Sequence, residues 1–203
     1  MAHGMKKHIA TTLTLSLRER GQSGFTLVEM VMVILVVGML AVTLASLLSS
    51  GVGAFMAGSE VSDTLSSLRL SSERIARELR TVRRDPAAMT DFDFLSRTAT
   101  SVQFRRLENN HVTVTTVTID SNGANLRIAY NTPAGTFTLS DQLDTASLSP
   151  PGGFALSYLQ QNGVTNAGAN DALVAFVDIE LSLRDSNGNS YPQRSRIALR
   201  NRQ

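Results

Sequence analysis

Hydrophobic residues are concentrated in one long run near the start of the chain. Residues 25–48 are almost all apolar, and no charged side chain lies between Glu29 and Glu60. The hydrocarbon core of a membrane is roughly 30 Å thick, and about 20 such residues cross it in a helix that rises about 1.5 Å per residue. The pattern therefore predicts a membrane-spanning helix over residues 25–48.

The hydrophobic pattern changes from continuous to one-sided after residue 60. Apolar residues then recur at steps of three, four and seven, which predicts an amphipathic helical stem over residues 49–85. The positions of this stripe are Val61, Leu65, Leu68, Ile75, Leu79 and Val82. Gly51, Gly53 and Gly58 each cost about 1 kcal/mol relative to alanine in a helix, which predicts a weakened joint over residues 49–59.

The stem is expected to end before a proline and to carry its charges on the outside. Because the residue before a proline favours extended backbone, the Asp85-Pro86 step predicts that the helix ends near Arg84. On the face opposite the apolar stripe, Glu73 with Arg77 and Arg74 with Glu78 are spaced as i,i+4 pairs. This spacing predicts solvent-exposed ion pairs.

Beyond Pro86 the apolar residues alternate with polar ones, which predicts a β-rich head over residues 86–203. Strands are predicted at residues 102–104, 112–119, 126–130, 154–159, 173–183 and 194–200, with loops at 133–153 and 160–171. The alternation changes phase between Thr115 and Thr116, which predicts a β-bulge there. Asn-Gly pairs at 122–123 and 187–188 predict hairpin turns, because both residues tolerate positive φ. The expected fold class is α+β, with a long N-terminal helix packed on an antiparallel sheet.

One carboxylate, that of Glu29, lies inside the apolar run. An acidic residue at the centre of a membrane helix costs about 2.5–3.5 kcal/mol, although near the end of the span it can reach the headgroup region. The residues around it are Gly24-Phe25-Thr26-Leu27-Val28-Glu29. This hexamer, followed by an apolar helix, resembles the N-terminal processing signal of type IV prepilins and pseudopilins.

The resemblance implies a maturation route. A prepilin peptidase would remove the leader, residues 1–24, by cutting between Gly24 and Phe25, and the new N-terminus at Phe25 would be N-methylated. Glu29 would become the fifth residue of the mature chain and pair with the N-terminal amine of a neighbouring subunit during assembly. Such pairing is physically reasonable, because matched charges offset the desolvation that each would suffer alone.

The charge distribution supports a membrane topology rather than nucleic-acid binding. Four basic residues and one acidic residue give the leader a net charge of +3, whereas the rest has 15 arginines against 16 carboxylates. Positive charge before the span predicts a cytoplasmic leader and an extracytoplasmic head. The resemblance to prepilins implies that the membrane is the bacterial inner membrane and that the head is periplasmic. No nucleic-acid partner is predicted, because the basic sequence pI comes from the leader. Either Met1 or Met5 could be the start of the chain.

Catalytic and metal-binding chemistry has little support in the sequence. Cysteine is absent, which excludes disulfides and thiol nucleophiles. His111 is the single histidine after the leader, so no triad or zinc site is predicted. No cofactor is expected. Calcium could be bound by the oxygens of Asp91 and Asp93, of Asp141 and Asp144, or of Asp185, Asn187 and Asn189. None of these groups matches an EF-hand loop, so turns are the favoured interpretation.

The sequence as a whole predicts a non-enzymatic, minor type IV pilin-like structural subunit. Residues 73–80 resemble the stem of J-type minor pseudopilins and related minor pilins, and the missing disulfide departs from many major pilins. The expected partners are a prepilin peptidase, other pilins or pseudopilins, and the inner membrane. A minor pseudopilin of a type II secretion system is the alternative within the class. A single-pass anchored β-domain that binds a ligand is the alternative outside it.

Overall fold

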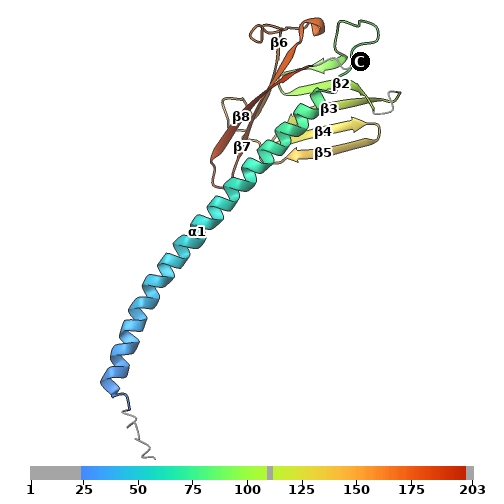
Figure 1. The fold of residues 1–203 in the computed structure, drawn as a ribbon. Helices are drawn as coiled ribbons and strands as arrows, with labels where there is room; N and C mark the ends of the chain where they lie inside the picture. The colour runs from blue at the N-terminus through green and yellow to red at the C-terminus, as the bar shows by residue number, and fades with distance from the viewer. Residues whose placement is uncertain (1–23, 109–111, 200–203) are drawn as a thin grey trace, which may run out of the picture. The chain divides into compact units, whose positions relative to one another are not determined.

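The computed structural model describes residues 24–108 and 112–199, and it contains one long helix followed by antiparallel strands (Figure 1). The elements are α1 (Leu27–Leu79), β1 (Phe94–Arg97), β2 (Ser101–Leu107), β3 (Val114–Asn122), β4 (Asn125–Asn131), β5 (Ala134–Ser140), β6 (Phe154–Leu159), the 3₁₀ helix η1 (Asp171–Leu173), β7 (Phe176–Arg184) and β8 (Ser190–Ala198). The predicted α+β fold is therefore confirmed. By their internal contacts the residues form two compact units that divide after Gly51.

The N-terminal unit contains the first half of α1, and its described residues are exposed in the isolated chain. Among the described residues, α1 is the helix that is long and apolar enough to cross a membrane. Three of its hydroxyl groups bond to its own backbone: those of Thr43, Ser46 and Ser50 donate to carbonyls three or four residues earlier, at 2.9–3.0 Å. These bonds keep the hydroxyls satisfied without water, as a hydrocarbon environment requires.

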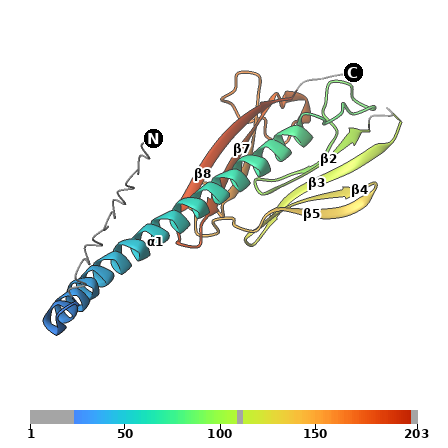
Figure 2. The same ribbon diagram turned by 60° about the horizontal axis from the view of Figure 1, so that its bottom comes forward.

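The C-terminal unit begins at Val52 and contains two antiparallel sheets, one in the order β1-β2-β3-β4-β5 and one in the order β6-β7-β8. Figure 2 shows the C-terminal part of α1 with β7 and β8 on one side and β2 to β5 on the other. Fully buried side chains from all three parts form one core, among them Ile75, Leu79, Phe104, Ile119, Phe154 and Ile179. The helix is thus held between the inner faces of both sheets.

For the stem helix, the prediction of which face is buried is largely confirmed, but the predicted C-terminal end is wrong. Leu68, Ile75 and Leu79 are at most 4% exposed, whereas Leu65, on the same stripe, is 45% exposed. The helix ends at Leu79 rather than near Arg84. The chain becomes extended earlier because residues 82–84 pair with the sheet: Val82 bridges Arg106, and the Arg83 N–H donates to the Arg105 carbonyl.

The predicted joint at residues 49–59 is not a break in the helix. Gly51, Gly53 and Gly58 all have helical backbone within α1, with no neighbouring atom where a side chain would stand. The glycines therefore lower the intrinsic helix propensity of this stretch without interrupting the helix.

Most predicted strands are confirmed, with three corrections. The bulge at Thr115 and Thr116 is absent, because β3 keeps one register against β2 and Thr115 simply occupies an inward position. Its hydroxyl donates to Glu108 at 2.6 Å, which makes a buried threonine tolerable there. Strand β1 was not predicted, and β5 lies in a stretch predicted to be loop. The Asn122-Gly123 hairpin is confirmed, with Gly123 at φ +60°.

Candidate functional site

The candidate site is the N-terminal segment that the sequence singled out, residues 24–29. Gly24, Phe25 and Thr26 precede the helix, and Thr26 acts as its N-cap. The Glu29 N–H lies 3.3 Å from the Thr26 hydroxyl oxygen, and the Met30 N–H donates to the Thr26 carbonyl at 3.1 Å. Thr26-Leu27-Val28-Glu29 has the spacing of a capping box, in which a threonine and a glutamate flank the first helical turn. The cap fixes where the helix starts.

This start leaves the Gly24–Phe25 peptide bond outside the helix. Phe25 is 72% exposed, and Gly24 is also exposed. Cleavage of this bond would break no helical hydrogen bond, because the first one runs from Met30 to Thr26. The new amino group would then lie one residue before the cap, and the Glu29 carboxylate would lie in the first turn, where the helix dipole favours negative charge.

Comparison with known proteins identifies this segment. Residues 20–45 match the family model of the prokaryotic N-terminal methylation motif. The chain therefore carries the prepilin-type N-terminal methylation motif of the type IV pilin and pseudopilin family. Proteins of this family are structural subunits and not enzymes, and the motif implies processing by a prepilin peptidase. No curated protein matches the chain, and no solved structure matches it.

The C-terminal head is joined to the stem helix at Glu60. The Glu60 carboxylate accepts hydrogen bonds from the Ser186 N–H at 2.6 Å and from the Asn187 side-chain amide at 2.7 Å. Ser186 and Asn187 belong to the turn between β7 and β8, which the sequence predicted. The contact connects that turn to the stem about five helical turns before the end of α1.

A second polar contact between stem and head is buried. The predicted Arg74–Glu78 pair is present, but its expected place on the exposed surface is wrong. Glu78, expected on the exposed face, has only 3% of its side chain exposed. Its carboxylate accepts hydrogen bonds from Arg106 of β2 and Tyr130 of β4, both at 2.8 Å, and Arg74 lies 3.2 Å away. Because two hydrogen bonds and an ion pair satisfy this one carboxylate, it can lie between helix and sheet. The exposed stem pair that does form is Arg69–Glu73 rather than Glu73–Arg77.

A third polar cluster lies in the three-stranded sheet. The Asp178 side chain of β7 is fully buried, yet Arg194 and Arg196 of β8 bond to it at 2.6–2.9 Å. Hydrogen bonds from Arg196 lower the pKa of Asp178 against the opposing effect of burial, and Arg194 lowers it further. Nothing in the sequence analysis marked these residues, although the 187–188 turn sets the register that pairs Asp178 with Arg196.

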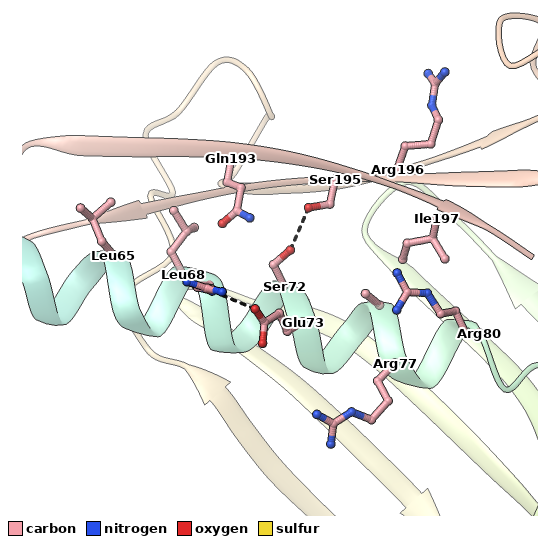
Figure 3. Close-up of a pocket in the computed structure, with 12 residues that line it drawn as sticks. Leu65, Leu68, Ser72, Glu73, Arg77, Arg80, Gln193, Ser195, Arg196 and Ile197 are labelled. Atoms are coloured by element: carbon pink, nitrogen blue, oxygen red, sulfur yellow. Dashed lines mark hydrogen bonds and ion pairs between the residues drawn. The ribbon is translucent and has the colours of Figure 1, made fainter.

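The stem and β8 also border an open groove of about 740 Å³. Figure 3 shows Ser72 of α1 and Ser195 of β8 facing each other across it, with their hydroxyl oxygens 3.1 Å apart. Arg77, Arg80 and Arg196 are among the residues that line it. Among the described side chains that line this groove, Arg69 and Glu73 form an ion pair and are 78% and 54% exposed, so this part of the groove has the character of solvated surface.

Most of the carboxylates considered for calcium have structural partners. Asp93 pairs with Arg83 at 2.6 Å, and Asp144 accepts the Ala146 N–H at 3.2 Å. Asp185 closes the β7–β8 turn by accepting the N–H and the side-chain amide of Asn189, which lowers its pKa. Over residues 24–108 and 112–199, no group of three or more candidate metal ligands occurs. His111 lies outside the described residues.

Proposed function

We propose that this chain is a minor type IV pilin-like structural subunit that is matured by a prepilin peptidase and assembled into a filament. The observation that carries the proposal is the methylation motif at residues 20–45, which ends in an apolar helix without internal packing partners. An exposed apolar helix must be covered by lipid or by other subunits. In a membrane-anchored precursor that becomes a filament subunit, lipid would cover the helix before assembly and other subunits would cover it afterwards.

The proposed organisation follows the sequence boundaries. Residues 1–24 form a cytoplasmic leader that is removed, residues 25–48 form the membrane and filament-core helix, residues 49–85 the stem, and residues 86–203 a periplasmic head. The structure supports a stem and head that share one core, because the fully buried apolar side chains lie between Ile75 and Ile197.

Glu29 is proposed to set the register of assembly by pairing with the N-terminal amine of a neighbouring subunit. Across the described residues, no arginine or lysine lies within ion-pair distance of its carboxylate. Apolar side chains from Leu27 to Val37 surround it along the helix, and all are about half exposed or more. Once neighbouring helices cover this surface, an unpaired carboxylate would be costly, so a matching ammonium is required.

A minor role is favoured by the absence of cysteine and by the J-like stem at residues 73–80. The same features fit a minor pseudopilin of a type II secretion system, and the genes that neighbour this one would distinguish the two. An anchored β-domain that binds a ligand would need the membrane helix but no processing.

The test is to express the full chain with and without an active prepilin peptidase and to determine the intact mass and N-terminal sequence. A product that begins at methylated Phe25 only when the peptidase is present supports the proposal. A known prepilin expressed in the same cells is the control for peptidase activity. If that control is cleaved and this chain remains uncut, the result contradicts the proposal and favours the anchored binding module.

A further inference from the structure

Within the C-terminal unit, the first stretch of α1 has no packing partner. Residues 52–59 are all exposed, and among the described residues no hydrogen bond or ion pair joins their side chains to either sheet. Gly53 and Gly58 lower the helix propensity further, and nothing lies within 4 Å of where their Cβ atoms would stand. Because packing supplies most of the stability of a helix in a protein, residues 52–59 are expected to unwind more readily than the stem.

Glu60 is the first residue of this unit whose side chain is held by the head. It is half-buried, and its carboxylate accepts the Ser186 N–H at 2.6 Å and the Asn187 side-chain amide at 2.7 Å. Thr64, one turn further on, is 1% exposed, but its hydroxyl has no hydrogen-bond partner among the described residues. A buried polar group without a partner is unfavourable, so Thr64 is a weaker anchor than Glu60. Glu60 therefore lies at the boundary between the exposed stretch and the seated stem.

The turn that receives Glu60 is fixed by its own hydrogen bonds. The Asp185 carboxylate accepts the Asn189 N–H at 2.7 Å, and the Gly188 N–H donates to the Asp185 carbonyl at 3.0 Å. Gly188 has a φ of +88°, in a region that favours glycine. Because these bonds lie within the turn, its two outward donors are already in place for the Glu60 carboxylate, and little conformational entropy is lost when the contact forms.

We propose that Glu60 and the β7–β8 turn form a clamp at which unwinding of α1 stops. Residues 52–59 then act as a hinge in which the helix opens and closes, while the stem from Glu60 to Leu79 stays seated on both sheets. Hinges are a few residues that absorb a change in backbone angles, and they are often small. This stretch contains two glycines, two alanines and a serine. The clamp confines the change to residues that have no packing to lose.

The proposal predicts where fast hydrogen exchange ends in α1. An amide in a helix bonds to the carbonyl four residues earlier, so unwinding of residues 52–59 releases amides as far as Asp63. The amide of Thr64, whose acceptor in a regular helix is the Glu60 carbonyl, is the first that the clamp protects. In the full chain reconstituted into phospholipid vesicles, amides of residues 52–63 should therefore exchange faster than those of residues 64–67. Mass spectrometry with fragmentation to single residues measures both groups.

A second carboxylate placed against Glu60 should open the clamp. Asn187→Asp keeps the size of the side chain but removes a donor and places two like charges face to face. Amides of residues 64–67 should then exchange at least about tenfold faster, because hydrogen bonds to a charged group are among the stronger ones. Asp63→Asn is the matched control, since this exposed carboxylate has no partner among the described residues, and it should leave that exchange unchanged.

Reversing the pair should close the clamp again. In the double variant Glu60→Gln with Asn187→Asp, the glutamine amide can donate to the new carboxylate, and its oxygen can still accept the Ser186 N–H. Exchange at residues 64–67 should return most of the way to the parent rate. A substitution that removes the charge of Glu60 would thus restore protection, which general damage to the turn does not predict.

Three results would each overturn the proposal. They are exchange at residues 52–59 as slow as in the stem of the parent, unchanged exchange at residues 64–67 in Asn187→Asp, and no recovery when Glu60→Gln is added. Slow exchange in β3 and β7 shows that each variant is folded. The clamp lies outside the cleavage segment, so a chain that is never processed should give the same pattern, and failure of the proposed function would leave this test intact.

Discussion

The carboxylate of Glu78 in the last turn of α1 accepts a hydrogen bond from Arg106 of β2 at 2.8 Å. The two residues are 28 positions apart in sequence, and the bond joins the stem to the five-stranded sheet. Tyr130 completes the cluster, since its hydroxyl donates to Glu78 and accepts a hydrogen bond from Arg74. This buried network fixes how the helix is seated on the sheet.

We expect Glu78→Gln to destabilise the C-terminal unit by about 2 kcal/mol. The change removes the charge that Arg106 and Arg74 face, and both arginines retain some contact with water, so the loss falls below the 3–5 kcal/mol of a fully buried pair. Thermal unfolding of the detergent-solubilised chain would measure it. Glu73→Gln, in the exposed pair with Arg69, is the matched control and should cost less than about 0.5 kcal/mol. Equal effects of the two variants would contradict a special role for Glu78.

Asp178 predicts a specific acid sensitivity. Hydrogen bonds from Arg196 and Arg194 hold its pKa below the ordinary value in the folded state. A depressed folded-state pKa contributes stability above the unfolded pKa of about 3.9, and this contribution is lost as the pH falls through the folded pKa. The melting temperature should therefore drop below about pH 4. Asp178→Asn should be less stable at neutral pH and should show a shallower acid decline. A variant whose decline remains as steep as that of the parent would show that other carboxylates dominate.

Two adjacent glycines should respond differently to alanine. Gly152 and Gly153 both have positive φ, at +66° and +80°. A Cβ at Gly153 would lie 2.8 Å from the Asp144 nitrogen and 3.0 Å from the Ser182 carbonyl oxygen, whereas one at Gly152 would meet nothing within 4 Å. Gly152→Ala should cost about 1–2 kcal/mol from backbone strain alone. Gly153→Ala should cost more, at least about 3 kcal/mol, because main-chain atoms must move. Comparable melting temperatures for both variants would refute the close approach.

Local patterns in the sequence predict local structure well. The hairpin at Asn122-Gly123 and the strand at residues 154–159 were predicted correctly because turn chemistry and alternation depend on adjacent residues. The turn at 187–188 also determines that Asp178 is opposite Arg196, so that pair could have been found by extending the hairpin register. The processing segment could also be predicted from adjacent residues, because it is defined by residues 24–29 and the apolar helix that follows them.

Features that depend on distant partners were not predictable in this way. Glu78 looks like one half of a surface pair, and only the position of Arg106 and Tyr130 on the sheet makes its burial possible. The helix was expected to continue to Arg84, because nothing local shows that Val82 and Arg83 pair with β2. Strand β5 was missed because apolar and polar residues alternate only weakly along it. Its large apolar residues are Phe137, which is exposed, and Leu139, which is half-buried.

Thr26→Ala should fray the first turn of α1. Its hydroxyl accepts the Glu29 N–H, and replacing an N-cap threonine by alanine typically costs about 1 kcal/mol. Hydrogen exchange of the amides at residues 28–30 should become faster, while exchange in the head stays unchanged. Thr26→Ser keeps the acceptor and should keep the slow exchange. Unchanged protection in the alanine variant would show that another group caps the helix.

Glu29→Ala separates maturation from assembly. The carboxylate is four residues beyond the Gly24–Phe25 bond and contacts that bond through none of the described hydrogen bonds, so cleavage should proceed at the parent rate. Incorporation should fall, because a neighbouring amine would be left buried without its counter-charge, a loss of about 3–5 kcal/mol for a fully buried pair. Pulse-labelling for cleavage and filament shearing for incorporation measure the two steps in the same cells. Glu29→Gln, which keeps size and polarity but removes the charge, should behave like alanine, whereas Glu29→Asp should retain part of the incorporation. Full incorporation of the glutamine variant would mean that hydrogen bonding or packing, and not charge pairing, accounts for the carboxylate in the apolar run.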